Sequence, residues 1–135
     1  MASKSNEIRV TDPITGGQKG SKPERYDLIP SQALDDVARV YGFGANKYAI
    51  HNWAKGYDWG LSIAALERHI SAFKQGENID QESGLPHLAH AVFHCLTLIM
   101  FSKYSLGTDS RLRLTEQTEG DDVFGQEYLV DRLEK

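Results

Sequence analysis

Apolar residues recur at helical spacing in three stretches of the chain, and segments rich in glycine, proline or polar residues separate these stretches. The first stretch predicts a helix that begins at Ser31, a suitable N-cap, and ends near Gly42, where glycine favours a stop. Its apolar positions are Ala33, Leu34, Val37, Ala38 and Tyr41. This spacing is typical of a helix with one apolar face.

A second helix is predicted between Asp58 and Gly76. Asp58 can cap the N-terminus of this helix, and Gly76 is a natural stop at its other end. Four apolar residues fall at positions i, i+3, i+7 and i+10, which place them on one side of a helix. They are Ile63, Leu66, Ile70 and Phe73.

The third and longest predicted helix runs from about Leu85 to Tyr104. Pro86 suits its first turn, because proline lacks the amide hydrogen that would be unpaired there. One face carries Leu88, Val92, Leu96 and Ile99. We expect this to be the central helix of the fold.

The remaining segments show no sustained helical or strand period. Residues 1–30 are expected to form an irregular N-terminal arm, and residues 42–60 a structured loop. Residues 105–120 resemble a linker, and Val123 to Leu133 allow a short final helix. The fold predicted is all-α: a compact helical bundle over residues 31–104, an irregular arm over 1–30, and a linker with a C-terminal helix over 105–135.

Composition limits the possible functions. A chain of 135 residues can bury one modest core, so we expect one domain with polar ends. The net charge of -4, from 15 basic and 19 acidic residues, argues against a dedicated nucleic-acid binder. The single cysteine, Cys95, lies in an apolar run and is expected to be buried, which favours a reducing, cytoplasmic location. No signal peptide or membrane-spanning segment is recognised.

Carboxylates and imidazoles gather between residues 77 and 90. These 14 residues hold Glu77, Asp80, Glu82, His87 and His90. Carboxylates suit divalent ions such as Mg²⁺ and Mn²⁺, whereas imidazoles favour softer metals or transfer protons. A single acidic or histidine residue is usually an ordinary surface or packing residue. So many polar groups at one helix junction, however, favour a functional site, since isolated polar groups in a core are costly.

Three histidines are predicted to share one side of the third helix. His87, His90 and His94 lie within about 60 degrees of one another, because successive helical residues turn by about 100 degrees. His69, on the second helix near the same loop, can face them. Such a stripe either lines a polar cavity or forms hydrogen bonds with neighbouring helices.

A second candidate cluster lies in the glycine-rich loop over residues 42–57, which combines glycines, lysines and aromatic rings. Glycines allow backbone amides to approach phosphate, lysines supply charge, and aromatic rings stack on a base. A packed surface loop would account for the same pattern. The candidates for phosphate contact are Lys22, Arg25, Lys47 and Lys55, and those for base stacking are Tyr48, Trp53 and Tyr57.

Five ordered blocks between residues 19 and 104 carry a resemblance to a known family. They are Lys22-Pro23-x-Arg25-Tyr26-Asp27-Leu28-Ile29-Pro30, Gly44-Ala45-x-Lys47-Tyr48, Asn52-Trp53, Arg68-His69 and Gly76-Glu77-x-x-Asp80-x-Glu82-Ser83-Gly84-Leu85-x-His87-Leu88-Ala89-His90-Ala91. Together they resemble the phage dATP/dGTP diphosphohydrolase family, and within it the MazZ-like enzymes. These enzymes are relatives of the MazG- and HisE-type all-α pyrophosphohydrolases.

The resemblance implies a metal-dependent (d)NTP diphosphohydrolase that converts dGTP, and GTP, to the monophosphate. The dGMP formed would supply the synthesis of 2-aminoadenine nucleotides in a phage, within the host cell cytoplasm. The resemblance also implies Mg²⁺ or Mn²⁺ as the cofactor and a homo-oligomer, either a dimer or a tetramer.

The sequence departs from the MazG pattern at the metal site. The Glu-x-x-Glu and Glu-x-x-Asp motifs are not intact on the predicted helices, and His87-Leu88-Ala89-His90 stands where the second would lie. We therefore expect Glu67, Glu77, Asp80 and Glu82 to bind metal. The expected catalytic residues are His69, His87 and His90. The expected substrate-binding residues are Lys22, Arg25, Lys47, Tyr48, Asn52, Trp53, Lys55 and Arg68.

Two other functions are compatible with the sequence. The first is a non-catalytic helical module that senses a nucleotide or binds a partner protein. The second is a nucleic-acid-associated phage protein, whose binding would weaken steeply with salt. It would use Lys19, Lys22, Arg25 and Lys47, but the acidic net charge disfavours it. The residues themselves do not distinguish guanine from adenine.

Overall fold

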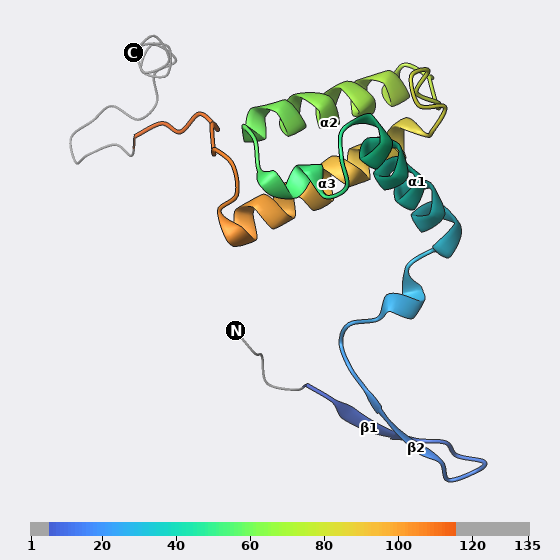
Figure 1. Ribbon diagram of the computed structural model, residues 1–135. Coiled ribbons are helices and arrows are strands. Elements are labelled where there is room, and N and C mark those ends of the chain that lie inside the picture. The colour runs from blue at the N-terminus through green and yellow to red at the C-terminus, as the bar shows by residue number, and fades with distance from the viewer. Residues whose placement is uncertain (1–5, 116–135) are drawn as a thin grey trace, which may run out of the picture.

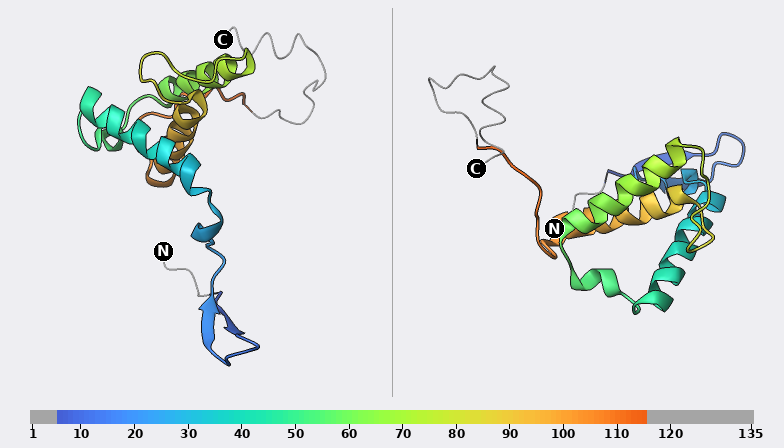
Figure 2. Two further views of the ribbon diagram at one scale, coloured as in Figure 1. Left: turned by 90° about the vertical axis from the view of Figure 1, so that its right-hand side faces the viewer. Right: turned by 90° about the horizontal axis from the view of Figure 1, so that it is seen from above.

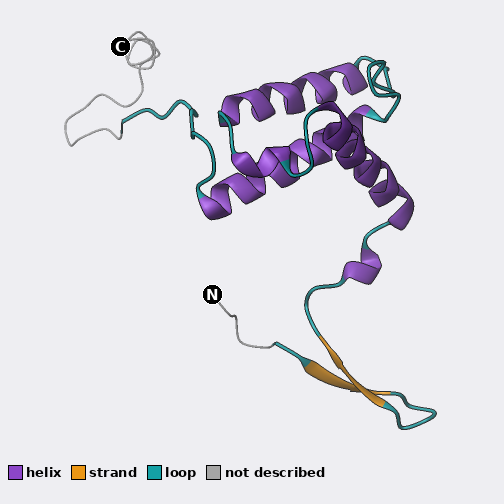
Figure 3. Ribbon diagram, viewed as in Figure 1, coloured by secondary structure: helices purple, strands orange, loops and turns teal. Residues whose placement is uncertain are grey.

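The structure, a computed structural model, describes residues 6–115. In chain order its elements are β1 (Ile8–Thr11), β2 (Gln18–Ser21), the 3₁₀ helix η1 (Tyr26–Leu28), α1 (Ser31–Lys47), the 3₁₀ helix η2 (Asn52–Lys55), α2 (Trp59–Lys74) and α3 (His87–Tyr104). Figure 1 shows α2 and α3 side by side, with α1 crossing them at one end. The described part of the chain is mostly helical, with one small sheet (Figure 3).

The prediction of an irregular arm in a purely all-α fold is wrong for residues 8–21, which form an antiparallel hairpin. The hairpin pairs Ile8 with Ser21 and Thr11 with Gln18. Its turn is stabilised by Asp12, whose carboxylate accepts hydrogen bonds from two following amides at 2.8 and 2.9 Å. Four residues of alternation are too short to reveal such a strand from sequence. The hairpin extends away from the helices (Figure 2).

Helix α1 begins at Ser31, but its N-cap residue is Pro30 and not Ser31 as predicted, and the helix passes through Gly42 and ends at Lys47. Two helical glycines, each costing about 1 kcal/mol relative to alanine, are therefore tolerated. Packing against α3 offsets this cost, because Val37 and Val40 of α1 are buried with Ala89 of α3. The extension removes residues 42–47 from the predicted loop and places Lys47 at a helix C-terminus.

Helix α2 confirms the prediction for residues 58–76. Asp58 is its N-cap, and its carboxylate accepts a hydrogen bond from the amide of Gly60 at 2.7 Å. The helix ends at Lys74, and Gly76 has a φ of 100°, which glycine adopts without strain.

Helix α3 begins at His87, two residues later than predicted, with Pro86 as its N-cap residue. The preceding loop folds back on itself, since the amide of Asp80 donates to the carbonyl of Leu85 at 2.8 Å. The amide of His87 then donates to the carbonyl of Asn78 at 2.9 Å. The prediction that this helix is central is confirmed, because α3 contacts both α1 and α2.

The outer side of α3 differs from the expectation in one respect, because Cys95 is exposed and not buried. Cys95 lies among the apolar residues predicted to share one face, and these are also exposed. Leu88, Val92, Leu96 and Ile99 keep 40%, 40%, 38% and 50% of their surface accessible. The described residues therefore leave part of the apolar run that led to the prediction of burial uncovered.

None of the described helices is long and apolar enough to cross a membrane. The final helix predicted for residues 123–133 lies outside the described residues.

Candidate active site

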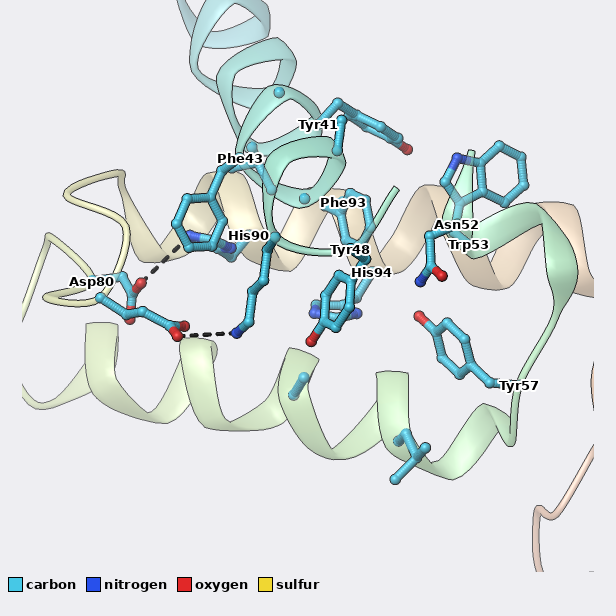
Figure 4. Close-up of a pocket in the computed structure, with 18 of the residues that line it drawn as sticks. Tyr41, Phe43, Tyr48, Asn52, Trp53, Tyr57, Asp80, His90, Phe93 and His94 are labelled. Atoms are coloured by element: carbon cyan, nitrogen blue, oxygen red, sulfur yellow. Dashed lines mark hydrogen bonds and ion pairs between the residues drawn. The ribbon is translucent and has the colours of Figure 1, made fainter. Parts of the chain in front are cut away.

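A pocket of about 740 Å³ lies between the C-terminal half of α1, the loop that follows it, α2, and α3. This is a volume typical of ligand pockets, which run from about 300 to 1,000 Å³. Both sequence-predicted clusters contribute to it (Figure 4). The residues with rings, charges or amides that line it are Tyr41, Phe43, Lys47, Tyr48, His51, Asn52, Trp53, Tyr57, Arg68, His69, Asp80, Glu82, His90, Phe93 and His94.

Imidazoles from two helices meet at one end of the pocket. His69 of α2 faces His87, the first residue of α3, with their Nδ1 atoms 2.8 Å apart. His90 stacks on His69, with ring centroids 4.6 Å apart and planes inclined by 9°. The folded loop between α2 and α3 produces this meeting, because it returns the chain so that the start of α3 lies beside the end of α2.

The hydrogen bonds of His87 determine which of its nitrogens carries the proton. Its Nε2 lies 2.7 Å from Oε1 of Glu77, and an ionised carboxylate can only accept, so Nε2 donates. In the neutral ring Nδ1 is then unprotonated and accepts from Nδ1 of His69. His69, whose ring lines the pocket, is left with an unprotonated Nε2 that can take a proton or bind a metal.

Asp80 is held by Ser83 beside the same imidazoles. The amide and hydroxyl of Ser83 both donate to Oδ2 of Asp80, at 3.0 and 2.8 Å. The hydroxyl oxygen also lies 2.6 Å from Nε2 of His90, which must donate because the serine proton is already used. Burial acts to raise the pKa of Asp80, but the Ser83 hydrogen bonds and the nearby histidines outweigh it and lower the pKa. The carboxylate is therefore ionised at neutral pH.

Burial also lowers the pKa values of the imidazoles that line the pocket. It is the largest cause for His69 and His90, and for His94 it lowers the pKa to about 4. Neighbouring histidines lower the pKa of each ring further, because like charges repel. These rings are consequently neutral at neutral pH, the form in which imidazole accepts protons or binds metals.

Three side chains of this group could hold a metal ion together. His69, Asp80 and His87 each offer one ligand atom, and the three atoms lie within 4.8 Å of one another. Of the four metal ligands expected from the sequence, Asp80 belongs to this group. Glu77 contacts His87 instead, Glu82 contacts Lys47, and Glu67 is exposed on α2 outside the pocket.

The charged end of the pocket consists of Lys47, Arg68, Asp80 and Glu82. The ammonium group of Lys47 lies 3.0 Å from Oε2 of Glu82, and this hydrogen bond raises the pKa of Lys47. The same ammonium group lies 5.5 Å from the centre of the Tyr48 ring. Both basic side chains were predicted to bind substrate, and the structure places both on the pocket wall.

The amide end of the pocket consists of Asn52, Trp53 and Tyr57, and lies away from Asp80 in Figure 4, with His94 between the two ends. The hydroxyl of Tyr57 is 2.6 Å from that of Ser62, which is 2.9 Å from Nδ1 of His94. Ser62 is fully buried. These hydrogen bonds to a buried serine therefore fix the position of the Tyr57 hydroxyl.

Three of the predicted substrate-binding residues do not line the pocket. Lys22 pairs with Glu7 in the hairpin region at 3.7 Å, and Arg25 pairs with Asp27 at 2.7 Å. Lys55 is exposed on η2. The sequence showed that these residues are basic, but it did not show that the backbone places them outside the pocket.

Sequence reasoning missed the two serines that position the histidines. Ser62 lies seven residues before His69, a spacing that puts both on one side of α2, so helical periodicity could have identified it. Ser83 lies in an irregular loop, and no periodic signal marks its contacts with Asp80 and His90.

Comparison with known proteins shows the family of this chain. The family described as dATP/dGTP diphosphohydrolase, N-terminal, matches residues 13–111, and the chain belongs to that family. A dATP/dGTP diphosphohydrolase of Salmonella phage PMBT28 is 36% identical over 64 residues. That match covers 47% of this chain but only 22% of the phage protein. No solved structure shows a significant match.

Proposed function

We propose that this chain acts as a metal-dependent (d)NTP diphosphohydrolase in the host cell cytoplasm, converting dGTP, and GTP, to dGMP and GMP. The dGMP would supply 2-aminoadenine nucleotide synthesis in a phage. The observation that carries the proposal is a single pocket in which basic side chains, an ionised carboxylate, neutral imidazoles and aromatic rings converge. The preference for guanine and the pathway rest on the resemblance of the ordered sequence blocks, and the family name agrees with a purine substrate.

The donor atoms at the charged end fit a divalent ion. Asp80, His69 and His87 would hold Mg²⁺ or Mn²⁺, and His87 would offer the ion its unprotonated Nδ1, which otherwise accepts the hydrogen bond from His69. Two imidazoles beside one carboxylate suit Mn²⁺ better than Mg²⁺. A bound ion would neutralise phosphate charge and lower the pKa of a water molecule. The ionised state of Asp80 and the neutral state of His69 meet the requirement that ligands be deprotonated.

The protein side chains supply the remaining chemistry. Lys47 and Arg68 would offset the negative charge of the triphosphate. A bond forms between the water oxygen and the α-phosphorus, the bond from that phosphorus to the bridging oxygen breaks, and pyrophosphate leaves. The imidazole of His90, which Ser83 holds in place, would accept the proton of the water.

The outer face of α3 supports the proposal of a homo-oligomer. Apart from the side that carries its histidines, this helix is mostly apolar, and the described residues leave part of its apolar surface exposed. Its exposed residues, Leu88, Val92, Leu96 and Ile99, follow one another at helical spacing and form one continuous stripe. A second copy would cover this stripe with an identical stripe, as in a twofold-symmetric dimer.

The experiment that tests the enzymatic proposal incubates the purified chain with each common NTP and dNTP in Mg²⁺, Mn²⁺ or a chelator. Chromatography of the products should show metal-dependent formation of dGMP from dGTP. Asp80→Asn should reduce turnover by at least about 1,000-fold, whereas Asp35→Asn, at an exposed position on α1 outside the pocket, should not change it. Nucleotide binding without turnover in any metal would contradict the enzymatic proposal and support a non-catalytic sensing module.

A further inference from the structure

The two ends of the pocket differ in the groups that they offer a ligand. The charged end presents ammonium, guanidinium and carboxylate groups, whereas the amide end presents neutral hydrogen-bonding groups and an indole ring. In Figure 4 Asp80 and His90 lie at one side of the view, and Asn52, Trp53 and Tyr57 at the other. A ligand that fills the pocket lengthwise must therefore be anionic at one end and aromatic or amide-like at the other.

The side chain of Asn52 has its full hydrogen-bonding capacity available. It is half-buried and lines the pocket, yet its amide forms no hydrogen bond with any residue in the part of the chain that the structure describes. A side-chain amide presents a donor and an acceptor side by side. That pair matches the edge of a base, such as O6 and N1–H of guanine or N1 and N6–H of adenine.

The Tyr57 hydroxyl provides a second polar group beside Asn52. The two side chains point toward one another across the amide end (Figure 4). Hydrogen bonds connect Tyr57 to Ser62 and Ser62 to His94, and the hydroxyl protons of Tyr57 and Ser62 can point in either direction along this series. The Tyr57 hydroxyl can thus either donate to a ligand or accept from it. The indole of Trp53, which also lines this end, supplies a flat apolar surface for a ring.

We infer that Asn52 recognises the edge of the nucleotide base, with the base at the amide end and the phosphates at the charged end. This inference rests on the proposed nucleotide substrate and adds its orientation and a residue that determines specificity. Asn52 acts in base recognition only, because it lies away from Asp80 and the imidazoles at the charged end. Its removal should weaken contacts with the base and leave contacts with phosphate unchanged.

The test separates the two ends by using one probe for each. Isothermal titration calorimetry in Mg²⁺ measures the binding of dGMP, which carries a base and one phosphate, and of tripolyphosphate, which has no base. Asn52→Leu keeps the size of the side chain and removes its hydrogen bonds, so dGMP should bind at least about tenfold more weakly. Tripolyphosphate should bind Asn52→Leu as it binds the wild type, and this unchanged affinity also shows that the variant is folded.

Two further variants complete the design. Lys47→Gln should weaken tripolyphosphate binding more than dGMP binding, which is the opposite pattern to that of Asn52→Leu. Asn46→Leu makes the same substitution at an exposed position on α1 outside the pocket and should change neither affinity. If the wild type binds both probes and Asn52→Leu leaves dGMP unchanged, or weakens tripolyphosphate instead, the inference is wrong. If the wild type binds neither probe, the proposed nucleotide function fails, and the inference fails with it.

Discussion

The two faces of α3 reverse the usual arrangement of an amphipathic helix. The inward face carries His87 and His90, which keep 5% and 8% of their surface accessible. The outward face carries apolar residues such as Leu96 and Ile99, which keep 38% and 50%. A surface helix ordinarily turns its apolar side to the core and its polar side to water. Here the polar side faces the pocket, and the apolar side is the one that the described residues leave partly exposed.

Different physical requirements account for the two faces. Burying an imidazole is costly unless its nitrogens are hydrogen-bonded, and the inward histidines meet this condition through Glu77, His69 and Ser83. Apolar surface is stabilised when it is removed from water, and the described residues leave the outward face partly exposed to water. The hydrogen bonds of the inward histidines are therefore met by described residues, whereas the outward face is the surface on which we propose that a second copy packs.

The largest effect is expected from breaking the inward face at His87. His87→Gln removes one of the three proposed metal ligands and also the ring that accepts from Nδ1 of His69, so His69 loses its fixed orientation. Turnover should fall by about 100- to 10,000-fold, the range associated with lost acid–base and positioning effects. Steady-state kinetics with dGTP measures this fall as a loss of kcat.

Glu77→Gln provides the graded comparison for His87→Gln. An amide oxygen still accepts from Nε2 of His87 but carries no charge, so the loss of turnover should be smaller. Turnover of His87→Gln within twofold of the wild type would show that the His69–His87 contact has no part in the reaction.

Much of this arrangement could be predicted from the sequence, because helical periodicity is a local signal. The bounds of α2 follow from a capping aspartate and a terminating glycine, and the histidine stripe on α3 follows from spacing. Spacing does not reveal which face of an apolar helix turns inward, so Cys95 was predicted to be buried and is exposed. The extension of α1 past Gly42 depends on packing with α3, which is a contact between distant parts of the chain. The contacts of Ser83 depend on irregular backbone, for which no periodic pattern exists. Asn52 was predicted to bind substrate, but its place at the end of the pocket away from Asp80 could not be predicted.

A smaller effect is expected from breaking the outward face at Leu96. Leu96→Glu places a charge in the middle of the apolar stripe, where a twofold interface would bury it in both copies. Burying an unpaired carboxylate costs several kcal/mol, so its presence in both copies should raise the dissociation constant of the oligomer by at least about 100-fold. Size-exclusion chromatography with light scattering measures the mass as a function of protein concentration.

The matched control for Leu96→Glu is Leu34→Glu, which introduces the same charge at an exposed leucine of α1. It should leave the mass unchanged, because Leu34 lies outside the stripe on α3. If Leu96→Glu has the same oligomeric mass as the wild type, or if the wild type is a monomer at high concentration, the outward face is not the site of self-association.

The smallest effect concerns the cost of burying imidazoles on the inward face, which pH can measure directly. Burial lowers the pKa of His94 from 6.5 to about 4, with further lowering by His69, His90 and Arg68. As the pH falls from 6.5 toward 4, the unfolded chain therefore binds a proton at this residue before the native chain does, and the native state loses stability. Above pH 6.5 the residue is neutral in both states and contributes no dependence on pH.

The loss of stability between pH 6.5 and 4 should amount to about 2 kcal/mol, less than the full pKa shift of His94 implies, because solvent still reaches part of the ring. Urea unfolding of the wild type and His94→Gln across this range tests the assignment. The free energy of unfolding of His94→Gln should depend less steeply on pH than that of the wild type, and the remaining histidines should account for the dependence that is left. Equal slopes for the two proteins would mean that the native state does not exclude the proton from His94.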